Sequence, residues 1–249
     1  MSKLSNKIAV VTGASKGIGA EIAKEFAAQG ATVVVNYSSS REGAEKVVAD
    51  ITAKGGKAVA IGGNVGVEKE VEALFAAVKE KFGRVDVLVN NAGKYEFGPL
   101  PTITTESFRK IYDVNVLGLL LATKAGVALM PDGGSVINIS SSVSGMAPPM
   151  AAVYTSSKGA VDVITKGLAK ELAGRQIRVN ALSPGLIITE GTHTAGIAGG
   201  EFETQFVSMT PLGRPGQVSD VAHPAVFLAS DDARYITGEL IYVSGGAGM

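Results

Sequence analysis

Cysteine and tryptophan are absent from this chain of 249 residues, and histidine occurs only twice. Without cysteine there can be no disulfide, no thiolate nucleophile and no cysteine metal ligand. Two histidines, His193 and His223, cannot build a histidine-rich zinc site, and we interpret both as ordinary loop or helix-end residues. We therefore expect no metal.

An excess of charge of one sign is also missing, because 23 basic and 23 acidic residues cancel. No bulk field favours nucleic acid or an anionic membrane, so we expect neither as a partner. The first seven residues lack the apolar core of a signal peptide. The apolar stretch from Val114 to Ala125 is interrupted by polar residues and is too short to span a bilayer. These features predict a cytoplasmic protein.

The chain shows no internal boundary. Its hydrophobic content of 46% can fill a large core, and no linker, charge block or repeat divides it. We expect one domain over residues 1–249.

Short apolar runs alternate with helical patterns along the chain. The runs lie near Val10 and at 32–36, 58–61, 85–89, 135–139, 178–182 and 240–243; the helical patterns lie at 20–29, 41–54, 67–82, 105–130 with an irregular middle, 151–173 and 217–230. Runs that are apolar nearly throughout are typical of parallel strands covered on both faces. The order predicts a single doubly wound Rossmann-type α/β fold with a seven-stranded parallel sheet and helices on both faces.

Tyr154 and Lys158 are four residues apart in a helical pattern, so both side chains project from one face. A phenol alone is a weak acid with a pKa of about 10. A nearby ammonium favours the phenolate and lowers that pKa. The pair predicts proton transfer to or from a carbonyl or alcohol oxygen.

A glycine-rich turn follows the first apolar run. Gly13, Gly17 and Gly19 stand in the spacing Gly-x3-Gly-x-Gly between a strand-like run and an amphipathic helix. Glycines let the backbone approach a pyrophosphate, which is stabilised by the amides and dipole of the helix N-terminus. This pattern predicts a dinucleotide site.

Together these motifs resemble the classical short-chain dehydrogenase/reductase family, nearly from end to end. Thr12 to Gly19 is similar to its cofactor loop, and Asn90 to Gly93 to the segment beside the adenine. The resemblance implies a catalytic tetrad of Asn115, Ser141, Tyr154 and Lys158. Ser140 and Ser142 flank Ser141, and we assign Ser141 because it stands thirteen residues before Tyr154 and because neighbours in a strand point to opposite sides.

The cofactor-binding residues are carried over from the same resemblance. They are Gly13, Ser15, Lys16, Gly17, Ile18, Gly19, Asn36, Tyr37, Ser38, Asn64, Val65, Asn91, Ala92, Gly93, Tyr154, Lys158, Pro184, Gly185, Ile187 and Thr189. The family often has an aspartate where this chain has Asn64.

The second apolar run distinguishes between the two nicotinamide cofactors. NAD-dependent folds of this kind place an acid at its end, where it accepts the ribose hydroxyls. Here Tyr37 is expected at that position, and no acid occurs before Glu42. Hydroxyls, an amide, Lys16 and Arg41 would accept a 2′-phosphate, so we expect NADP(H).

The resemblance also implies the reaction. Tyr154 exchanges a proton with the substrate oxygen, Ser141 hydrogen-bonds that oxygen, and Lys158 holds the ribose and lowers the pKa of the tyrosine. The backbone carbonyl of Asn115 would hold a water that relays protons from Lys158. We expect a small-molecule carbonyl or alcohol substrate, and a homotetramer by resemblance alone.

The substrate is the least determined feature. The segment 186–212 is expected to form a glycine-rich lid without lysine or arginine. Tyr95, Phe97, Met146, Pro148, Pro149 and Met150 are candidates for an apolar pocket. Basic residues for an acidic carrier protein are sparse, with Lys124 and, nearby, Arg175 and Arg178. These features favour reduction of a small free ketone. A 3-oxoacyl-[acyl-carrier-protein] reductase, a sugar or polyol dehydrogenase and an inactive NADP-binding sensor remain alternatives.

Overall fold

The computed structural model describes residues 2–248, and a parallel sheet runs through their middle. Its strands are β1 (Ile8–Val11), β2 (Thr32–Tyr37), β3 (Lys57–Gly62), β4 (Val87–Asn90), β5 (Ser135–Ile139), β6 (Arg178–Pro184) and β7 (Leu240–Val243). They are arranged in the order β3-β2-β1-β4-β5-β6-β7, and each pairing is parallel. The doubly wound fold expected from the sequence is confirmed.

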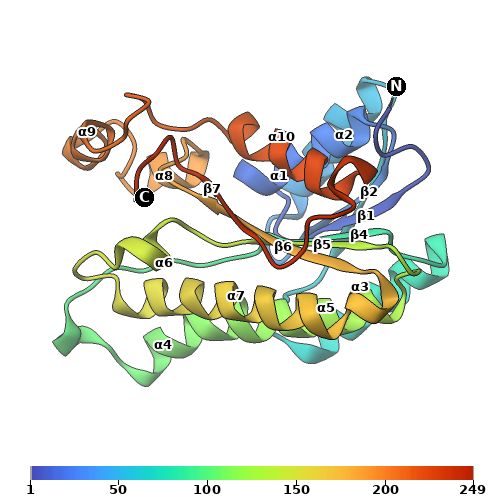
Figure 1. The fold of residues 1–249 in the computed structure, drawn as a ribbon, viewed down its shortest axis with the longest axis horizontal. Coiled ribbons are helices and arrows are strands. Elements are labelled where there is room, and N and C mark those ends of the chain that lie inside the picture. Colours follow the sequence, from blue (N-terminus) through green and yellow to red (C-terminus); the bar gives the residue numbers. More distant parts are fainter. Residues whose placement is uncertain (1, 249) are drawn as a thin grey trace.

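Helices cover both faces of the sheet. They are α1 (Gly17–Ala28), α2 (Arg41–Ala53), α3 (Glu68–Phe82), α4 (Thr105–Tyr112), α5 (Leu119–Ala128), α6 (Val143–Met146), α7 (Ala152–Glu171), α8 (Glu190–Thr194), α9 (Glu201–Ser208) and α10 (Val218–Ala229), with 3-10 turns η1 (Leu100–Thr102), η3 (Ala173–Arg175) and η4 (Asp231–Ala233) and a π-helical turn η2 (Asp113–Gly118). Helices α1, α2 and α10 lie on one face, and α3, α4, α5 and α7 lie on the other (Figure 1).

Alternation along the strands fills two cores. Ala9 and Val11 of β1 pack in the core under α1 and α10, while Val10 packs in the core on the α3 and α5 side. All three are fully buried. Because successive side chains point to opposite faces, a strand buried on both faces must be apolar throughout. Phe26 of α1 is also fully buried, and its truncation to alanine would cost about 3–5 kcal/mol.

The helical run Thr105–Ala128 contains the irregular middle that the sequence predicted. It is interrupted by the π-helical turn η2, which carries Asn115. By length and mean hydropathy the run could cross a membrane, but the core helix of a globular protein can have the same length and mean hydropathy. In this fold, α5 packs against α3 and β4. Thr123 of α5 is buried and accepts a hydrogen bond from Asn90.

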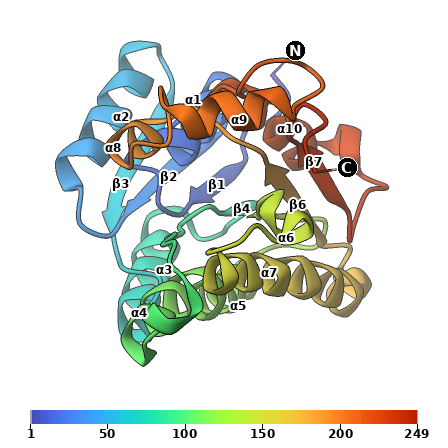
Figure 2. The same ribbon diagram turned by 90° about the vertical axis from the view of Figure 1, so that its left-hand side faces the viewer.

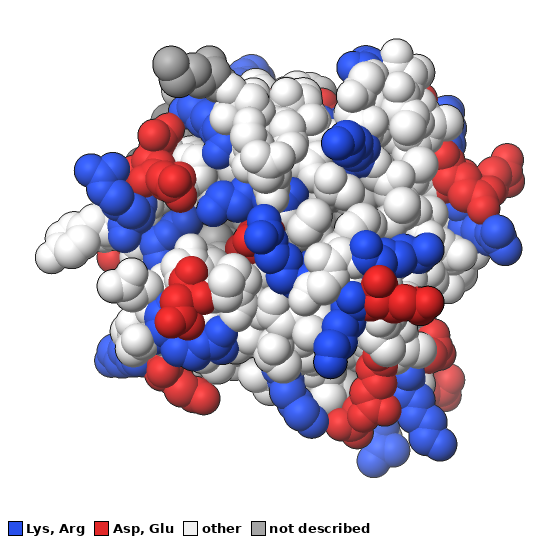
Figure 3. All heavy atoms as spheres, turned by 90° about the vertical axis from the view of Figure 1, so that its right-hand side faces the viewer, with Lys and Arg blue, Asp and Glu red and all other residues white. Residues whose placement is uncertain are grey.

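The order of the strands reverses between β1 and β4, so the polypeptide leaves these two strands towards opposite faces. In such sheets a crevice opens at the carboxyl ends of the strands at this point. Helices α6, α8 and α9 lie around that edge, which faces the viewer in Figure 2. The opposite edge carries interspersed basic and acidic side chains (Figure 3).

Candidate active site

A cleft of about 880 Å³ lies over the carboxyl ends of the strands. Most residues predicted for cofactor and catalysis line it: Gly13, Ser15, Lys16, Gly17, Ile18, Asn36, Ser38, Asn64, Val65, Asn91, Ala92, Gly93, Ser141, Tyr154, Lys158, Pro184, Gly185, Ile187 and Thr189. Gly19, Tyr37 and Asn115 do not line it. The ring of Tyr37 lies over Gly62 of β3 instead.

The glycine-rich turn is shaped by close backbone contacts. Gly13 and Gly17 have φ values of 62° and 59°, a region that favours glycine. A Cβ on Gly13 would lie 2.8 Å from the Cα of Ala92, and one on Gly19 would lie 2.3 Å from the Nδ2 of Asn91. The turn therefore tolerates only glycine at these positions. It presents the N-terminus of α1 to the cleft, where the helix dipole favours an anion.

Asn91 fixes this turn from the end of β4. Its Nδ2 donates hydrogen bonds to the backbone oxygens of Thr12 and Gly13, both at 2.9 Å. The Oγ1 of Thr12 in turn accepts from the backbone amides of Asn91 at 3.0 Å and Ala92 at 3.1 Å. The two loops that follow β1 and β4 thus form one hydrogen-bonded unit.

The end of β2 carries no carboxylate into the cleft. Asn36 is buried, accepts from the amide of Gly13 through Oδ1 at 3.3 Å and donates through Nδ2 to the carbonyl of Gly63 at 3.0 Å. The Asn36 side chain therefore holds together the loops that follow β1 and β3. Ser38, Ser39 and Ser40 line the cleft beyond it.

Two cations lie near this end of the cleft. Lys16 is exposed and precedes α1. The guanidinium of Arg41 is paired with Glu45 at 2.7 Å, one turn along α2. Because both partners are largely exposed, the pair adds little stability and leaves Arg41 free to exchange partners.

Tyr154 and Lys158 lie together in the first half of α7. The Nζ of Lys158 lies 5.9 Å from the centroid of the Tyr154 ring and donates to the carbonyl of Ile139 at 2.8 Å. Burial lowers the pKa of Lys158 to about 8. Its ammonium is therefore charged at neutral pH but close to titration.

The pKa of Tyr154 differs from the expectation. Burial raises it above the ordinary value, since a phenolate is costly to desolvate, and a hydrogen bond with Ser141 opposes this rise. Burial therefore dominates in the protein alone, and the lowering of this pKa by Lys158 stays a prediction. In this state Tyr154 is a protonated phenol, which is the form that donates a proton to a carbonyl.

The three serines after β5 have different surroundings. Ser141 lies against Tyr154, and its Oγ accepts from the amide of Val143 at 3.4 Å. The Oγ of Ser140 donates to Asp162 at 2.6 Å, on α7. Ser142 is buried, and its hydroxyl has no hydrogen-bond partner among the described residues. This arrangement supports Ser141 as the serine directed at a substrate.

Asn115 connects three segments from within the π-helical turn. Its Oδ1 accepts from the amide of Lys94 at 2.7 Å, and its Nδ2 donates to the carbonyl of Lys94 at 2.9 Å and to Ser157 at 3.0 Å. The side chain therefore fixes the loop after β4 against α7. A Cβ on Gly93 would lie 3.5 Å from this Oδ1 and 3.7 Å from the Nζ of Lys158.

The segment after β6 closes the cleft from the other side. Thr189 caps α8, since its Oγ1 accepts from the amide of Thr192 at 3.1 Å. The carboxylate of Glu190 reaches the glycine-rich turn and accepts from the amide of Gly17 at 3.2 Å. Sequence reasoning did not find this contact, since nothing near Glu190 marks it as a partner of the turn.

Aromatic side chains surround the catalytic end. Tyr95, Phe97 and Tyr154 have pairwise ring separations of 6.0, 6.1 and 5.9 Å. Pro148, Pro149, Met150, Phe202 and Phe206 also line the cleft. Met146, which we had expected there, packs instead with Leu186, Phe206 and Ala247.

Arg175 and Arg178 do not lie near the mouth of the cleft. Within one chain they lie at the opposite edge of the sheet, because β6 begins at Arg178 and α7 runs back from the catalytic edge. Arg175 pairs with Asp132 at 3.2 Å, and Arg178 is buried. The expectation that they lie near the pocket was wrong, because helix α7 is 20 residues long and separates them from Tyr154.

Comparisons agree with this geometry. A family model described as enoyl-(acyl carrier protein) reductase matches residues 13–248. An uncharacterized oxidoreductase of Methylorubrum extorquens is 57% identical over 246 residues, covering 99% of each chain. The 3-oxoacyl-[acyl-carrier-protein] reductase of Staphylococcus aureus is 41% identical over 245 residues, covering 98% of each.

A solved structure, an angucycline C-6 ketoreductase with bound NADP, is 34% identical with a TM-score of 0.93, covering 99% of this chain and 97% of its own. The chain belongs to the short-chain dehydrogenase/reductase family of oxidoreductases.

Proposed function

We propose that this protein is an NADPH-dependent carbonyl reductase acting on a small, mostly apolar free ketone. The observation that supports this most is the convergence of Tyr154, Ser141 and Lys158 at the aromatic end of a cleft that begins at the glycine-rich turn. A proton donor, an oxygen-binding hydroxyl and a cation are the groups that carbonyl reduction requires from a protein.

NADP(H) is the cofactor, and the residues present fit it. The turn from Gly13 to Gly19 would hold the pyrophosphate, and at Gly13 and Gly19 an added Cβ would collide with neighbouring atoms. Ser38, with Ser39 and Ser40, would surround the 2′-phosphate without an opposing carboxylate. When bound, the reduced nicotinamide supplies the hydride.

The remaining steps belong to side chains of this chain. Ser141 hydrogen-bonds the carbonyl oxygen, and Tyr154 donates its phenolic proton to that oxygen as negative charge develops on it. Lys158 stabilises the resulting phenolate and would hold the ribose hydroxyls. Asn115 and Lys158 both border Gly93, which supports a proton relay from Lys158 past Asn115.

The substrate end of the cleft is apolar, and the expected lid over it, residues 186–212, is acidic. Tyr95, Phe97 and Phe202 line the cleft, and residues 186–212 contain three glutamates and no lysine or arginine. An apolar ketone would be desolvated there at little cost, whereas an anionic one would meet no cation from this segment. We propose that residues 186–212, with α8 and α9, form the lid of a single catalytic domain.

A second candidate is 3-oxoacyl-[acyl-carrier-protein] reductase, which is favoured by the relative of that activity at 41% identity. Both candidates use the same chemistry and differ in what lies beyond the reacting carbonyl.

We also propose a homotetramer in the cytoplasm. Phe108 of α4, Leu117 of η2, Leu120 of α5 and Val163 of α7 are exposed, and burying them between copies would remove apolar surface from water. Light scattering on the purified protein would give the number of chains directly. A monomer at micromolar concentration would contradict this proposal.

The test of function is NADPH oxidation on a small prochiral ketone and on a 3-oxoacyl thioester, side by side. Much faster turnover of the ketone would support our proposal. Much faster turnover of the thioester would establish the second candidate. No turnover of either, with tight NADPH binding, would contradict both.

A further inference from the structure

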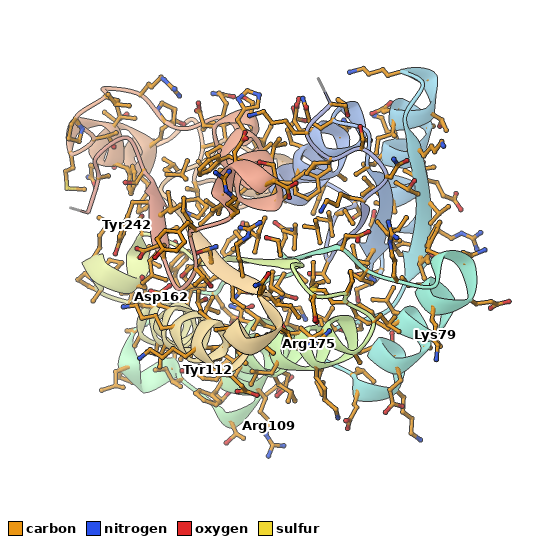
Figure 4. The ribbon with its side chains drawn as sticks, turned by 45° about the vertical axis from the view of Figure 1, so that its right-hand side comes forward. Lys79, Arg109, Tyr112, Asp162, Arg175 and Tyr242 are labelled. Carbon is orange, nitrogen blue, oxygen red and sulfur yellow. The ribbon has the colours of Figure 1, made fainter. Side chains whose placement is uncertain are left out.

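Asp162 lies on the same face of α7 as the catalytic pair, one turn after Lys158 and two turns after Tyr154. Its Oδ1 accepts a hydrogen bond of 2.6 Å from the Oγ of Ser140. Ser140 is buried and directly precedes Ser141. Asp162 lies in the middle of α7, and Figure 4 shows it well apart from Arg175.

Two side chains join α7 to the end of β5 in opposite directions. Lys158 donates from the helix to the carbonyl of Ile139 at 2.8 Å. Ser140 donates from the strand side to Asp162, and its Oγ also lies 3.3 Å from the carbonyl oxygen of Lys158. The backbone amide of Ser140 is held by the carbonyl of Leu182 on β6 at 2.8 Å. These bonds fix the helix bearing Tyr154 relative to the segment bearing Ser141.

We propose that Asp162 is a positioning residue of the active site. Its carboxylate holds Ser140, and with it the segment that bears Ser141. It also places a negative charge at Ser140, next to Ile139, whose carbonyl accepts from the buried ammonium of Lys158. The catalytic consequences rest on the function proposed above, whereas the effect on Lys158 does not.

The charges around Lys158 support this role. Burial lowers the pKa of Lys158 to about 8, and the negative charge of Asp162 opposes that fall. Tyr154 faces Lys158 from the same helix. The uncharged Oδ1 of Asn115 and the Nζ of Lys158 both lie within 4 Å of where a Cβ on Gly93 would stand, and the Nζ donates to the carbonyl of Ile139 at the end of β5. Lys94 and Tyr95 stand on the loop after β4. Burial raises the pKa of Tyr154, and Tyr95 adds a smaller rise.

The first test requires no substrate. The side-chain 13Cε resonance of Lys158, assigned by its loss in Lys158→Met, is titrated with pH in the wild type and in Asp162→Asn. We expect the midpoint to fall by about half a pH unit or more in the variant, since a favourable charge is removed from a buried site. An unchanged or raised midpoint would overturn the proposal. If Asp162→Asn does not fold, Asp162→Ser removes the same charge and is subject to the same criterion.

The second test separates positioning from charge. Ser140→Ala keeps the carboxylate but removes its hydrogen bond, so kcat should fall several-fold while the midpoint of Lys158 stays near the wild-type value. A kcat equal to that of the wild type would overturn the positioning role.

The pH profile of kcat/KM connects the two tests. Its alkaline limb should move to lower pH in Asp162→Asn and return to the wild-type position in Asp162→Glu. If the limb of Asp162→Asn superimposes on that of the wild type, the proposed role of Asp162 is contradicted. If the wild type itself reduces no carbonyl, the proposed function fails, and the titration of Lys158 still decides the inference about Asp162.

Discussion

The carboxylate of Glu190 accepts a hydrogen bond from the backbone amide of Gly17, across 173 residues of sequence. Gly17 is the first residue of α1, where unpaired amides and the helix dipole attract anions. A carboxylate there satisfies the same amide that a pyrophosphate would use. We therefore expect a bound pyrophosphate to displace Glu190 from this amide.

Replacement of Glu190 by glutamine should tighten NADPH binding. The amide side chain competes less strongly for Gly17 and removes a charge that repels phosphate. Because Glu190 is exposed, we expect an effect of about 0.5–1 kcal/mol, a two- to fivefold lower Kd. Fluorescence titration with NADPH measures it. Glu201→Gln, in the same lid segment, is the control and should leave the Kd for NADPH unchanged. Equal effects of both variants would contradict the prediction.

Replacement of Tyr154 by phenylalanine should slow reduction strongly without weakening cofactor binding. The variant keeps the ring that packs against Tyr95 and Phe97 but lacks the proton. General acid catalysis contributes about 10²–10⁴-fold, so kcat should fall at least a hundredfold. Steady-state kinetics and an NADPH binding titration check this together. Turnover within tenfold of the wild type would exclude Tyr154 as the acid.

Lys158→Met should reveal the cost of the buried ammonium. The pKa of Lys158 is about 8 in the fold and about 10.4 when unfolded, so the unfolded chain binds more protons between these values. Stability of the wild type relative to the variant should therefore rise as pH increases from about 8 to about 10.4, by roughly 1.4 kcal/mol per unit of pKa difference at most. Urea unfolding of both proteins at three pH values measures it. A difference independent of pH would contradict the lowered pKa.

Ser38→Asp should weaken the preference for NADP(H). A carboxylate at the end of β2 repels a 2′-phosphate and accepts ribose hydroxyls instead. We expect the ratio of the NADPH and NADH dissociation constants to change by tenfold or more, as about 1.4 kcal/mol would produce. Ser38→Asn, which adds an uncharged side chain of the same size, is the control. Equal ratios for both variants would show that charge at this position does not select the cofactor.

Much of the site could be predicted because its residues follow strands. Thr12 to Gly19 follows β1, Asn91 to Gly93 follows β4, and Ser141 lies two residues after β5. Parallel strands bring their carboxyl ends to one edge, so the order of elements already gathers these motifs. Tyr37 was expected at the cofactor, but it is the last residue of β2 and does not line the cleft. The direction of its ring depends on strand register and packing, which place the ring over Gly62.

The sequence by itself determined the doubly wound sheet, the family and the candidate residues, because hydrophobic periodicity and short motifs are local. The tertiary structure decided what packing brings together over long sequence separations. Those contacts join Glu190 to Gly17 and Asp162 to Ser140. Packing also places Arg175 beside Asp132, at the edge of the sheet opposite the cleft. It also decided protonation, since burial sets the pKa values of Tyr154 and Lys158 and depends on every element around them.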